Sequence, residues 1–476
     1  MRKTKIVCTM GPRESDPEIL RALAGEMDVA RFNFSHGDHA SHLDMLQRVR
    51  AAAAEAGRPI AMLLETKGPE IRTGVTADAS GFDLIKGSRV VLTTEDVPCT
   101  AERIAVSYAG LPQDVAAGGT ILIDDGNIEL RVDGTGAAEV FCTVITGGHV
   151  SSRKGINVPG TVIRLPGITD KDIEDIRFGI LNGYDYIAAS FVRDAETIHR
   201  IRAMIDEAGA QTRIIAKIES HEGVANLGAI IDAADGIMVA RGDLGVEVEA
   251  KMIPQLQREI IRRCNESGKL VITATQMLDS MIRNPRPTRA EVTDVANAVY
   301  EGSDAVMLSG ETASGEYPVE ALRMMASIVE YTEQFPEELP EAVVRTGPVF
   351  AGNIAQTTCH AAVTSAQDLR AKAIIAPTSS GTTALLLSKL RPESDIYALS
   401  PDPSVVRQMM LFRGVYPVLA ERADSTDELM ADSLRILRDH GLLQSGDLCV
   451  FTAGTVLGVQ KSQRSATNMM RIIELP

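Results

Sequence analysis

The sequence predicts a (β/α)8 TIM barrel with an inserted all-β lid domain and a C-terminal α/β domain. Eight short apolar runs alternate with segments of helical periodicity, as the buried parallel strands of such a barrel do. The runs begin at Lys5, Val29, Ile60, Tyr186, Arg213, Gly236, Leu270 and Asp304. The third and fourth runs start 126 residues apart, whereas the other starts are 23 to 34 residues apart. One long interval among otherwise regular strand–helix units indicates a domain inserted after the third strand.

The inserted segment, residues 69–165, has the sequence pattern of a small all-β domain. Its β-rich runs are short, and turns such as Asp125-Gly126 and Gly147-Gly148 separate them. The runs are Phe82–Ile85, Arg89–Thr94, Arg103–Tyr108, Thr120–Ile123, Ile128–Val132 and Glu139–Ile145. The barrel is then formed by residues 1–68 and 166–340. A β domain tethered by two linkers above a barrel mouth is a natural lid over a site.

Residues 341–476 repeat the α/β alternation after a linker rich in Pro and Glu, Phe335–Val349. The strongest local feature is a loop that follows an apolar run and opens a helix over Ala384–Leu390. It reads Thr378, Ser379, Ser380, Gly381, Thr382 and Thr383. Hydroxyl groups and free N–H groups at a helix N-terminus are typical of an anion site. An ordinary N-cap turn has the same composition, and spacing alone leaves both interpretations open.

Composition narrows the classes of function. The net charge of −16 argues against nucleic acid or an anionic membrane as a general partner, so a phosphate ligand needs a local pocket of cations. No apolar run approaches the ~18 residues of a membrane helix. The first apolar run stops at Gly11-Pro12, too early for a signal peptide. Six cysteines without a CxxC pair indicate reduced thiols in a cytoplasm, not disulfides or a zinc site.

Two neighbouring strands are expected to end in carboxylates. The fifth run ends in Lys217-Ile218-Glu219 and the sixth in Arg241-Gly242-Asp243. Two carboxylates 4 Å apart repel by about 4 kcal/mol near a protein surface. Mg²⁺ or Mn²⁺ removes that cost and favours oxygen ligands. The alternative is a pair of solvated loop residues, but the lysine beside Glu219 favours a site.

Further polar residues stand at the other strand ends. They are Arg31, Asn33, Ser35 and His36 in the second unit, Glu65, Thr66, Lys67, Glu70 and Arg72 in the third, Thr273, Thr275 and Gln276 in the seventh, and Ser309 and Glu311 in the eighth. Strand alternation places Arg31, Asn33 and Ser35 on one face, where polar groups are hard to satisfy unless they line a site. Cations, paired carboxylates and neutral oxygens are the parts that phosphoryl transfer needs. No Walker A loop, glycine-rich kinase loop, GxGxxG motif after a strand, or nucleophilic triad is present. His36 and His221 are candidate bases, although a lone histidine is more often structural.

These residues resemble the motifs of pyruvate kinase over nearly the whole chain. The resemblance rests on RFNFSH (31–36), TKGPEIR (66–72), KIE (217–219), MVARGDLG (238–245), ATQM (274–277), PRPTRAE (285–291) and LSGET (308–312). It implies a barrel with a lid after the third strand and a C-terminal regulatory domain. It also implies transfer of the phosphoryl group of phosphoenolpyruvate to ADP, giving pyruvate and ATP in the last step of glycolysis, by an allosteric homotetramer.

The resemblance also implies roles for individual residues. Lys217 corresponds to the lysine that stabilises the transferring phosphoryl group and the enolate, and Thr275 to the residue beside the carbon that is protonated. Glu219 and Asp243 correspond to ligands of Mg²⁺ (or Mn²⁺), with Gly242 against the substrate. The phosphate contacts are Arg31 and Arg72, the nucleotide contacts are Asn33, His36, Arg72 and Lys154, and the K⁺ ligands are Asn33, Ser35, Glu65 and Thr66.

The chain departs from the family pattern at a few positions. Glu65 stands where the family usually has Asp, so one extra methylene displaces a potassium ligand or sends its carboxylate elsewhere. Glu70 matches the potassium-requiring members, since potassium-independent members carry Lys there, and this predicts potassium dependence. Ser465–Asn468 is only similar to the usual Gly-Thr-Thr-Asn. The loop Thr378–Thr383 resembles the phosphate loop of members that respond to sugar monophosphates or AMP, which leaves the effector open.

Two other functions compete with this interpretation. Metal-dependent aldolases on barrels also stabilise a pyruvate enolate with paired carboxylates, but Lys217, the insert and the face formed by Arg31 to Ser35 favour phosphate chemistry. A catalytically dead sensor that uses the C-terminal anion site alone is the second rival. The intact set of Lys217, Glu219, Asp243 and Thr275 argues against it.

Overall fold

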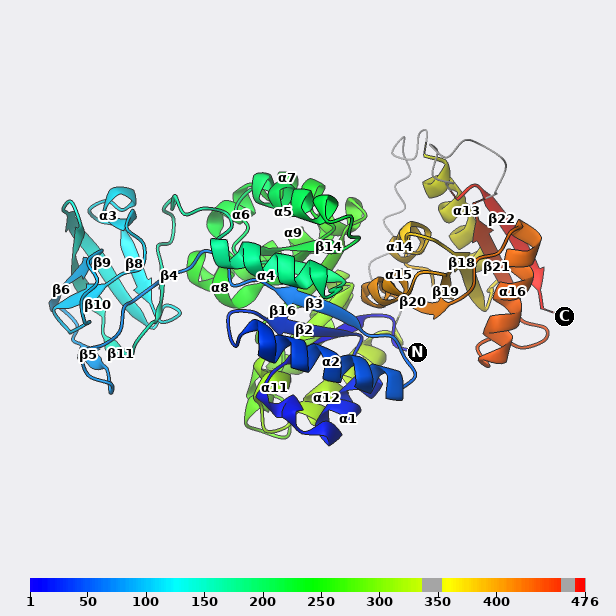
Figure 1. The fold of residues 1–476 in the computed structure, drawn as a ribbon, viewed down its shortest axis with the longest axis horizontal. Coiled ribbons are helices and arrows are strands. Elements are labelled where there is room, and N and C mark those ends of the chain that lie inside the picture. Colours follow the sequence, from blue (N-terminus) through cyan, green and yellow to red (C-terminus); the bar gives the residue numbers. More distant parts are fainter. Residues whose placement is uncertain (336–352, 455–466, 476) are drawn as a thin grey trace.

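The computed structural model describes residues 1–335, 353–454 and 467–475. A central barrel carries an all-β insert on one side and an α/β unit on the other, so that three bodies lie in a row (Figure 1). The expected fold class is confirmed. Residues 336–349 of the expected linker and the positions Ser465 and Ala466 lie outside the described residues.

Eight parallel strands close the barrel in the order β1-β17-β16-β15-β14-β13-β3-β2. They are β1 (Lys5–Met10), β2 (Val29–Asn33), β3 (Ala61–Glu65), β13 (Tyr186–Ala189), β14 (Arg213–Ile218), β15 (Gly236–Ala240), β16 (Leu270–Ala274) and β17 (Ala305–Leu308). Each strand lies within one of the eight predicted apolar runs. The runs are apolar throughout because helices cover the outside of the barrel and side chains fill the inside.

Helices surround the barrel in the expected alternation. They are α1 (Pro17–Glu26), α2 (His39–Glu55), α4 (Asp170–Leu181), α5 (Ala195–Glu207), α6 (His221–Ala225), α7 (Leu227–Ala233), α8 (Arg241–Glu247), α9 (Ile253–Glu266), α10 (Arg289–Glu301), α11 (Gly310–Ala313) and α12 (Pro318–Thr332), with short 3₁₀ turns η1 (Pro12–Ser15), η2 (Ala250–Met252) and η3 (Asp279–Ile282). Local sequence sets their starts. Thr288 and Glu291, within the PRPTRAE motif, form a capping box that begins α10.

The insert is an antiparallel-rich sheet in the order β4-β12-β8-β9-β10-β6-β7, with a separate pair β11-β5. Its elements are β4 (Ile71–Arg72), β5 (Phe82–Leu84), β6 (Arg89–Thr93), β7 (Arg103–Ala105), α3 (Leu111–Asp114), β8 (Thr120–Ile123), β9 (Ile128–Thr135), β10 (Glu139–Thr146), β11 (Gly148–Val150) and β12 (Gly155–Asn157). Each of the six predicted runs corresponds to one strand, although β9 ends three residues and β10 one residue beyond the predicted ends. The strands β4, β11 and β12 were not predicted, because they have only two or three residues and no longer β-rich run surrounds them.

The C-terminal unit is a five-stranded sheet in the order β20-β19-β18-β21-β22, in which only β22 is antiparallel to its neighbour. Its elements are α13 (Ile354–Asp368), β18 (Ala373–Pro377), α14 (Thr382–Lys389), β19 (Asp395–Ser400), α15 (Pro403–Gln408), η6 (Met409–Leu411), β20 (Val415–Leu419), α16 (Thr426–Asp439), β21 (Leu448–Ala453) and β22 (Met469–Glu474). The helix predicted over Ala384–Leu390 begins two residues earlier, at Thr382.

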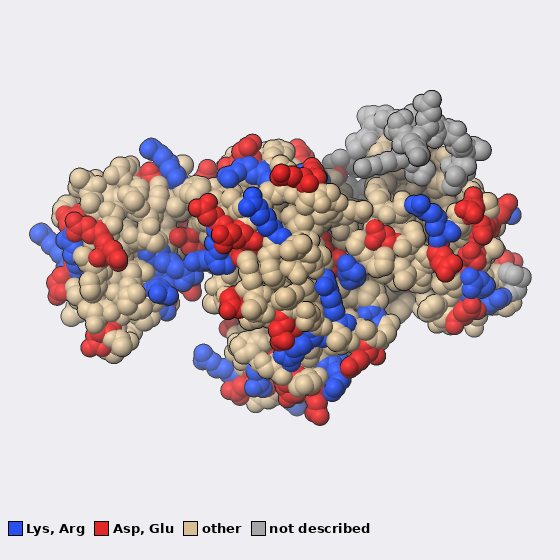
Figure 2. Space-filling model, viewed as in Figure 1, with Lys and Arg blue, Asp and Glu red and all other residues tan. Residues whose placement is uncertain are grey.

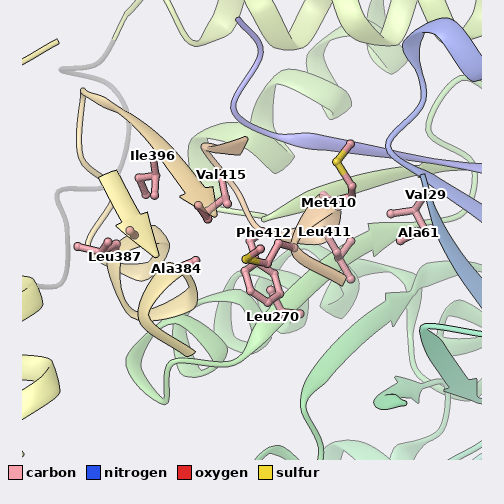
Figure 3. Close-up of a cluster of buried hydrophobic side chains, with 14 of the residues drawn as sticks. Val29, Ala61, Leu270, Ala384, Leu387, Ile396, Met410, Leu411, Phe412 and Val415 are labelled. Atoms are coloured by element: carbon pink, nitrogen blue, oxygen red, sulfur yellow. The ribbon is translucent and has the colours of Figure 1, made fainter. Parts of the chain in front are cut away.

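One hydrophobic cluster joins the barrel interior to the C-terminal unit. Val29, Ala61 and Leu270 from barrel strands belong to the same buried cluster as Met410 and Phe412 (Figure 3). The first residues of barrel strands lie at the end of the barrel opposite the catalytic mouth, so the C-terminal unit closes that lower end. This leaves the upper end for the site.

Two expectations from composition concern membrane helices and cysteines. No helix among them is both long and apolar enough to cross a membrane. All six cysteines are buried and unpaired.

Candidate active site

A cavity of about 150 Å³ opens at the C-terminal ends of the barrel strands. Its lining includes the predicted residues Arg31, Asn33, Ser35, Glu65, Lys217, Glu219, Asp243 and Thr275. These side chains come from five different strands or the turns after them. The barrel therefore gathers residues that lie more than 240 positions apart in the sequence.

Lys217 lies at the centre of the charged groups. It follows Ile215 on the inward face of β14, and its Nζ lies 2.6 Å from Glu219 Oε1 and 3.0 Å from Glu65 Oε1. It also donates to Ser190 Oγ at 3.1 Å. Burial lowers the pKa of Lys217, but the carboxylates of Glu219 and Glu65 outweigh burial and raise the pKa overall. The ammonium is therefore firmly charged.

Arg31 is held by a two-pronged pair with Glu65. Its Nε and Nη2 each donate to one Glu65 oxygen at 2.6 Å, and its Nη1 donates to Thr9 Oγ1 at 2.7 Å. Burial raises the pKa of Glu65, whereas Arg31 and Lys217 lower it more strongly, to about 2. Glu65 is therefore ionised at neutral pH, and its carboxylate belongs to the cation pair Arg31 and Lys217.

Glu219 and Asp243 have the chemistry of a divalent-cation site. Burial raises the pKa of Glu219 to about 7; Lys217 opposes the increase and Asp243 adds to it. Glu219 Oε2 accepts from the Phe191 N–H at 2.6 Å, and the buried Oε1 pairs with the Lys217 ammonium at 2.6 Å. Lys217 is shared between Glu219 and Glu65, and Asp243 adds a further negative charge beside Glu219, so a magnesium ion fits these two carboxylates. Asp243 lies in the first turn of α8, not at the end of a strand as expected.

Thr275 occupies a strained position at the edge of the cavity. Its φ is 67°, a left-handed conformation that β-branched residues rarely adopt, and the φ of the next residue, Gln276, is 54°. The Thr275 hydroxyl accepts from the Gly242 N–H at 2.9 Å. Backbone strain of this kind gathers at functional sites because the surrounding structure maintains it. Gly242 itself does not line the cavity, but it anchors the hydroxyl that does.

Only three of the four residues that correspond to a potassium site lie together in the cavity. Asn33, Ser35 and Glu65 line the cavity, whereas Thr66 does not. β2 ends at Asn33, so Ser35 lies in the turn after the strand and not on the strand face that was predicted. Asn33 Oδ1 accepts from the Ser35 N–H at 3.0 Å, and Thr66 Oγ1 accepts from the Ser190 N–H at 3.1 Å. With both Glu65 oxygens bound to cations, this set does not fit a potassium ion as it stands.

A second, larger cavity of about 440 Å³ lies between the insert and the barrel. Arg72 and Lys154, predicted nucleotide contacts, line it together with Asp243. Arg72 pairs with Glu70 at 2.7 Å, and Lys154 pairs with Asp124 at 2.7 Å. Figure 2 shows acidic and basic side chains mixed over the surface, with basic ones along the junction of the insert and the barrel.

The two histidines have different surroundings. His221 lines the larger cavity. His36, predicted as a nucleotide contact, is exposed on the turn after β2 and lines neither this cavity nor the small one.

The C-terminal loop keeps most of its hydroxyl groups near the surface. Gly381 has a φ of 77° and precedes the first turn of α14, and Ser380 and Thr382 are exposed. Thr383 is different, because it is buried and its hydroxyl bonds to that of Thr467 at 2.6 Å. Ser380 also offers its carbonyl oxygen to Arg213, the first residue of β14, at 3.0 Å.

Sequence reasoning missed three residues that shape the site. Ser190 and Thr9 are the hydroxyl partners of Lys217 and Arg31, and Asp125 of the insert lines the larger cavity. The only available signal for Ser190 was a hydroxyl residue at the end of the fourth apolar run. Burial raises the pKa of Asp125, and Asp243 raises it further, which indicates that this part of the insert faces Asp243.

Comparisons with known proteins agree with this geometry. Family models for the pyruvate kinase barrel domain and the pyruvate kinase alpha/beta domain match residues 1–322 and 356–473. A pyruvate kinase of Geobacillus stearothermophilus is 46% identical over 99% of this chain and 80% of its own length, and one of Staphylococcus saprophyticus is 45% identical over the same shares. The crystal structure of a pyruvate kinase from Cryptosporidium parvum matches with a TM-score of 0.90 and 38% identity, covering 100% of this chain and 96% of that one. The chain therefore belongs to the pyruvate kinase family.

Proposed function

We propose that the chain transfers the phosphoryl group of phosphoenolpyruvate to ADP and releases pyruvate and ATP. The observation that carries the proposal is the position of Lys217, a buried ammonium between Glu65 and Glu219 in the cavity that Thr275 borders. Phosphoryl transfer depends mainly on positioning and on charge stabilisation, and this cavity provides both. Family membership supports the same reaction.

Arg31 and Lys217 bind the phosphoryl group of the substrate in this mechanism. Arg31 has five N–H donors, and Glu65 and Thr9 take three of them, so two remain for phosphate oxygens. Lys217 neutralises the phosphoryl group as it leaves and then the negative charge that develops on the enolate oxygen. The Thr275 hydroxyl lies beside the position at which the enolate carbon gains a proton.

Glu219 and Asp243 would hold a magnesium or manganese ion. When bound, this ion supplies positive charge that polarises the oxygens of the substrate and offsets the charge of the transition state. Pyruvate kinases as a family use Mg²⁺ and K⁺. The buried Glu219 beside Asp243 supports the divalent site, whereas the ion pairs of Glu65 with Arg31 and Lys217 count against the potassium dependence that Glu70 predicts.

The insert, residues 69–165, would act as a lid. Arg72 and Lys154 line the cavity between the lid and the barrel. Their ion pairs with Glu70 and Asp124 would break when ADP binds, and both side chains would then contact its phosphates. Closure then excludes water from the transferring phosphoryl group. Asn33 lines the small cavity, whereas His36 lies on the turn beyond it. A nucleotide contact at His36 therefore requires movement of that turn.

Other features of the proposal rest on the resemblance to the family. The barrel would comprise residues 1–68 and 166–340, and residues 341–476 would form a regulatory domain. A sugar monophosphate or AMP would bind the loop Thr378–Thr383, and the enzyme would work as a homotetramer in the cytoplasm. The exposed Ser380 and Thr382 support the loop as a phosphate site, while the buried Thr383 would contribute only its backbone.

The decisive experiment measures pyruvate formation from phosphoenolpyruvate and ADP with Mg²⁺. Wild-type protein is expected to turn over only with both ADP and metal, and Lys217→Met is expected to abolish turnover. Lys251→Met is the matched control, since this exposed lysine lies outside both cavities. Pyruvate released from a hydroxy-oxo acid without ADP would make the chain a lyase. Binding of a sugar phosphate by folded protein without turnover would make it a sensor.

A further inference from the structure

Glu65 differs from the Asp that the family usually has at this position, and its carboxylate forms ion pairs with Arg31 and Lys217. The side chain is 4% exposed, and its two oxygens receive three charged donors, two from Arg31 at 2.6 Å and one from Lys217 at 3.0 Å. Glu65 ends β3, opposite Asn33 on β2. The extra methylene thus gives the carboxylate the reach to form a fork with Arg31 while touching Lys217.

These contacts compete with a monovalent cation. A potassium ion bound to Glu65 would lie beside a guanidinium and an ammonium that already neutralise the carboxylate, and like charges repel strongly in a buried site. Two of the neutral oxygens are partly engaged as well. Asn33 Oδ1 and Thr66 Oγ1 already accept backbone N–H groups, and Thr66 does not line the cavity.

We propose that Glu65 is a positioning residue, which fixes Arg31 and Lys217 for the substrate phosphoryl group and is thereby withdrawn from the potassium site. The inference rests on the proposed function and adds to it a specific prediction about cations. This chain binds K⁺ more weakly, and discriminates K⁺ from other monovalent ions less, than the same chain with Asp at position 65.

The positioning role follows from how many donors Glu65 engages. Arg31 and Lys217 carry long side chains that lose much rotamer freedom when they are ordered. A planar carboxylate that binds two parallel N–H groups of Arg31 fixes the orientation of the guanidinium plane. Thr9 holds the third donor of Arg31 and Ser190 holds a second donor of Lys217, so both cations are oriented before substrate arrives.

Two substitutions test the inference in the full-length protein. Glu65→Asp shortens the side chain to the family pattern, and Glu65→Gln keeps its length but removes its charge. Monovalent-cation binding is measured without substrate, by the line width of the ²⁰⁵Tl⁺ NMR signal and by the melting temperature in KCl against tetramethylammonium chloride. Pyruvate formation is then measured with Mg²⁺ in the same two salts.

The wild type is expected to show no K⁺-specific rise in melting temperature and a turnover in K⁺ within about twofold of that in tetramethylammonium. Glu65→Asp is expected to bind Tl⁺ and to gain at least about a tenfold preference for K⁺, which corresponds to 1.4 kcal/mol. Glu65→Gln is expected to lower kcat at least tenfold with no rise in KM, because the freed cations still attract phosphoenolpyruvate but are no longer oriented. A merely structural role would lower the melting temperature without this separation of kcat from KM.

The inference is overturned if the wild type binds Tl⁺ as tightly as Glu65→Asp and needs K⁺ equally. It is also overturned if Glu65→Gln keeps the wild-type kcat. Failure of the proposed function gives a different result, namely no pyruvate from any variant in either salt. The Tl⁺ and melting measurements require no turnover. They therefore still show whether Glu65 binds a monovalent cation.

Discussion

Lys217 and Glu219 stand two residues apart at the end of β14, with Nζ and Oε1 separated by 2.6 Å. The same ammonium also pairs with Glu65, and Asp243 adds negative charge near Glu219. The ion pair therefore only partly satisfies the carboxylate. A divalent cation held by Glu219 and Asp243 would supply the missing positive charge and leave Lys217 available to the substrate.

Replacing Glu219 by Gln should weaken divalent-ion binding. The amide keeps the size of the side chain but loses the charge that a hard cation requires. We expect the Kd for Mn²⁺, followed by its electron paramagnetic resonance signal, to rise at least about tenfold, or 1.4 kcal/mol. Glu249→Gln, at an exposed position paired with Lys251, is the control and should leave the Kd unchanged. An unchanged Mn²⁺ affinity in Glu219→Gln would place the metal elsewhere.

Thr275 should show a conflict between stability and activity. Its φ of 67° strains a β-branched residue such as Thr, whereas Gly adopts it freely. We expect Thr275→Gly to be more stable than Thr275→Ala by about 1 kcal/mol, because both lack the hydroxyl but only Gly relieves the strain. Both variants should lose about 10²-fold or more in kcat, as expected when a proton-transfer group is removed, whereas Thr275→Ser should keep most of it. Urea unfolding and steady-state kinetics on the three variants measure the two effects separately, and a fully active Thr275→Ala would remove Thr275 from the mechanism.

The sequence was sufficient for the barrel because buried parallel strands are apolar along their whole length, as in β14 and β15. It also placed Lys217 and Glu219 in the site, since strand ends carry the polar residues of this fold. Side-chain contacts between strands that are distant in the sequence could not be predicted. No local pattern shows that Glu65 turns to Arg31 and Lys217, or that Ser190 at the end of an apolar run meets Lys217. The chain enters α8 at Arg241 directly after β15, so Asp243 lies in a helical turn and not at a strand end.

Lys389 and Asp304 should couple the C-terminal unit to the barrel. They form an ion pair in which the side chains are only 7% and 1% exposed, and Asp304 also accepts the Val271 N–H at 2.8 Å. Lys389→Met leaves a buried carboxylate without its partner, which costs about 3–5 kcal/mol. Adding Asp304→Asn should recover part of that loss. Calorimetry on the two single variants and the double variant gives the coupling, and strictly additive losses would show that the pair contributes no interaction of its own.

Glu14 should make stability depend on pH. It is fully buried in the turn after β1, where Oε2 accepts the Gly11 N–H at 2.6 Å and Oε1 has no partner among the described residues. Burial raises the pKa of Glu14 to about 8, despite the opposing effect of the Gly11 hydrogen bond. Between the unfolded pKa of about 4.3 and pH 8, the folded state therefore retains a proton that the unfolded state releases. The contribution of Glu14 to stability is fully present below that window and is lost as the pH rises through it.

Glu14→Gln removes this loss because the amide stays neutral at every pH. We expect the variant to melt close to wild type at pH 5 and several degrees higher at pH 8.5, with most of the difference appearing between pH 6 and 8. Glu18→Gln, an exposed neighbour on α1, should show a constant offset across the same range and serves as the control. A pH-independent difference for Glu14→Gln would mean that the folded protein already carries Glu14 as a carboxylate at pH 5, stabilised by the Gly11 N–H alone.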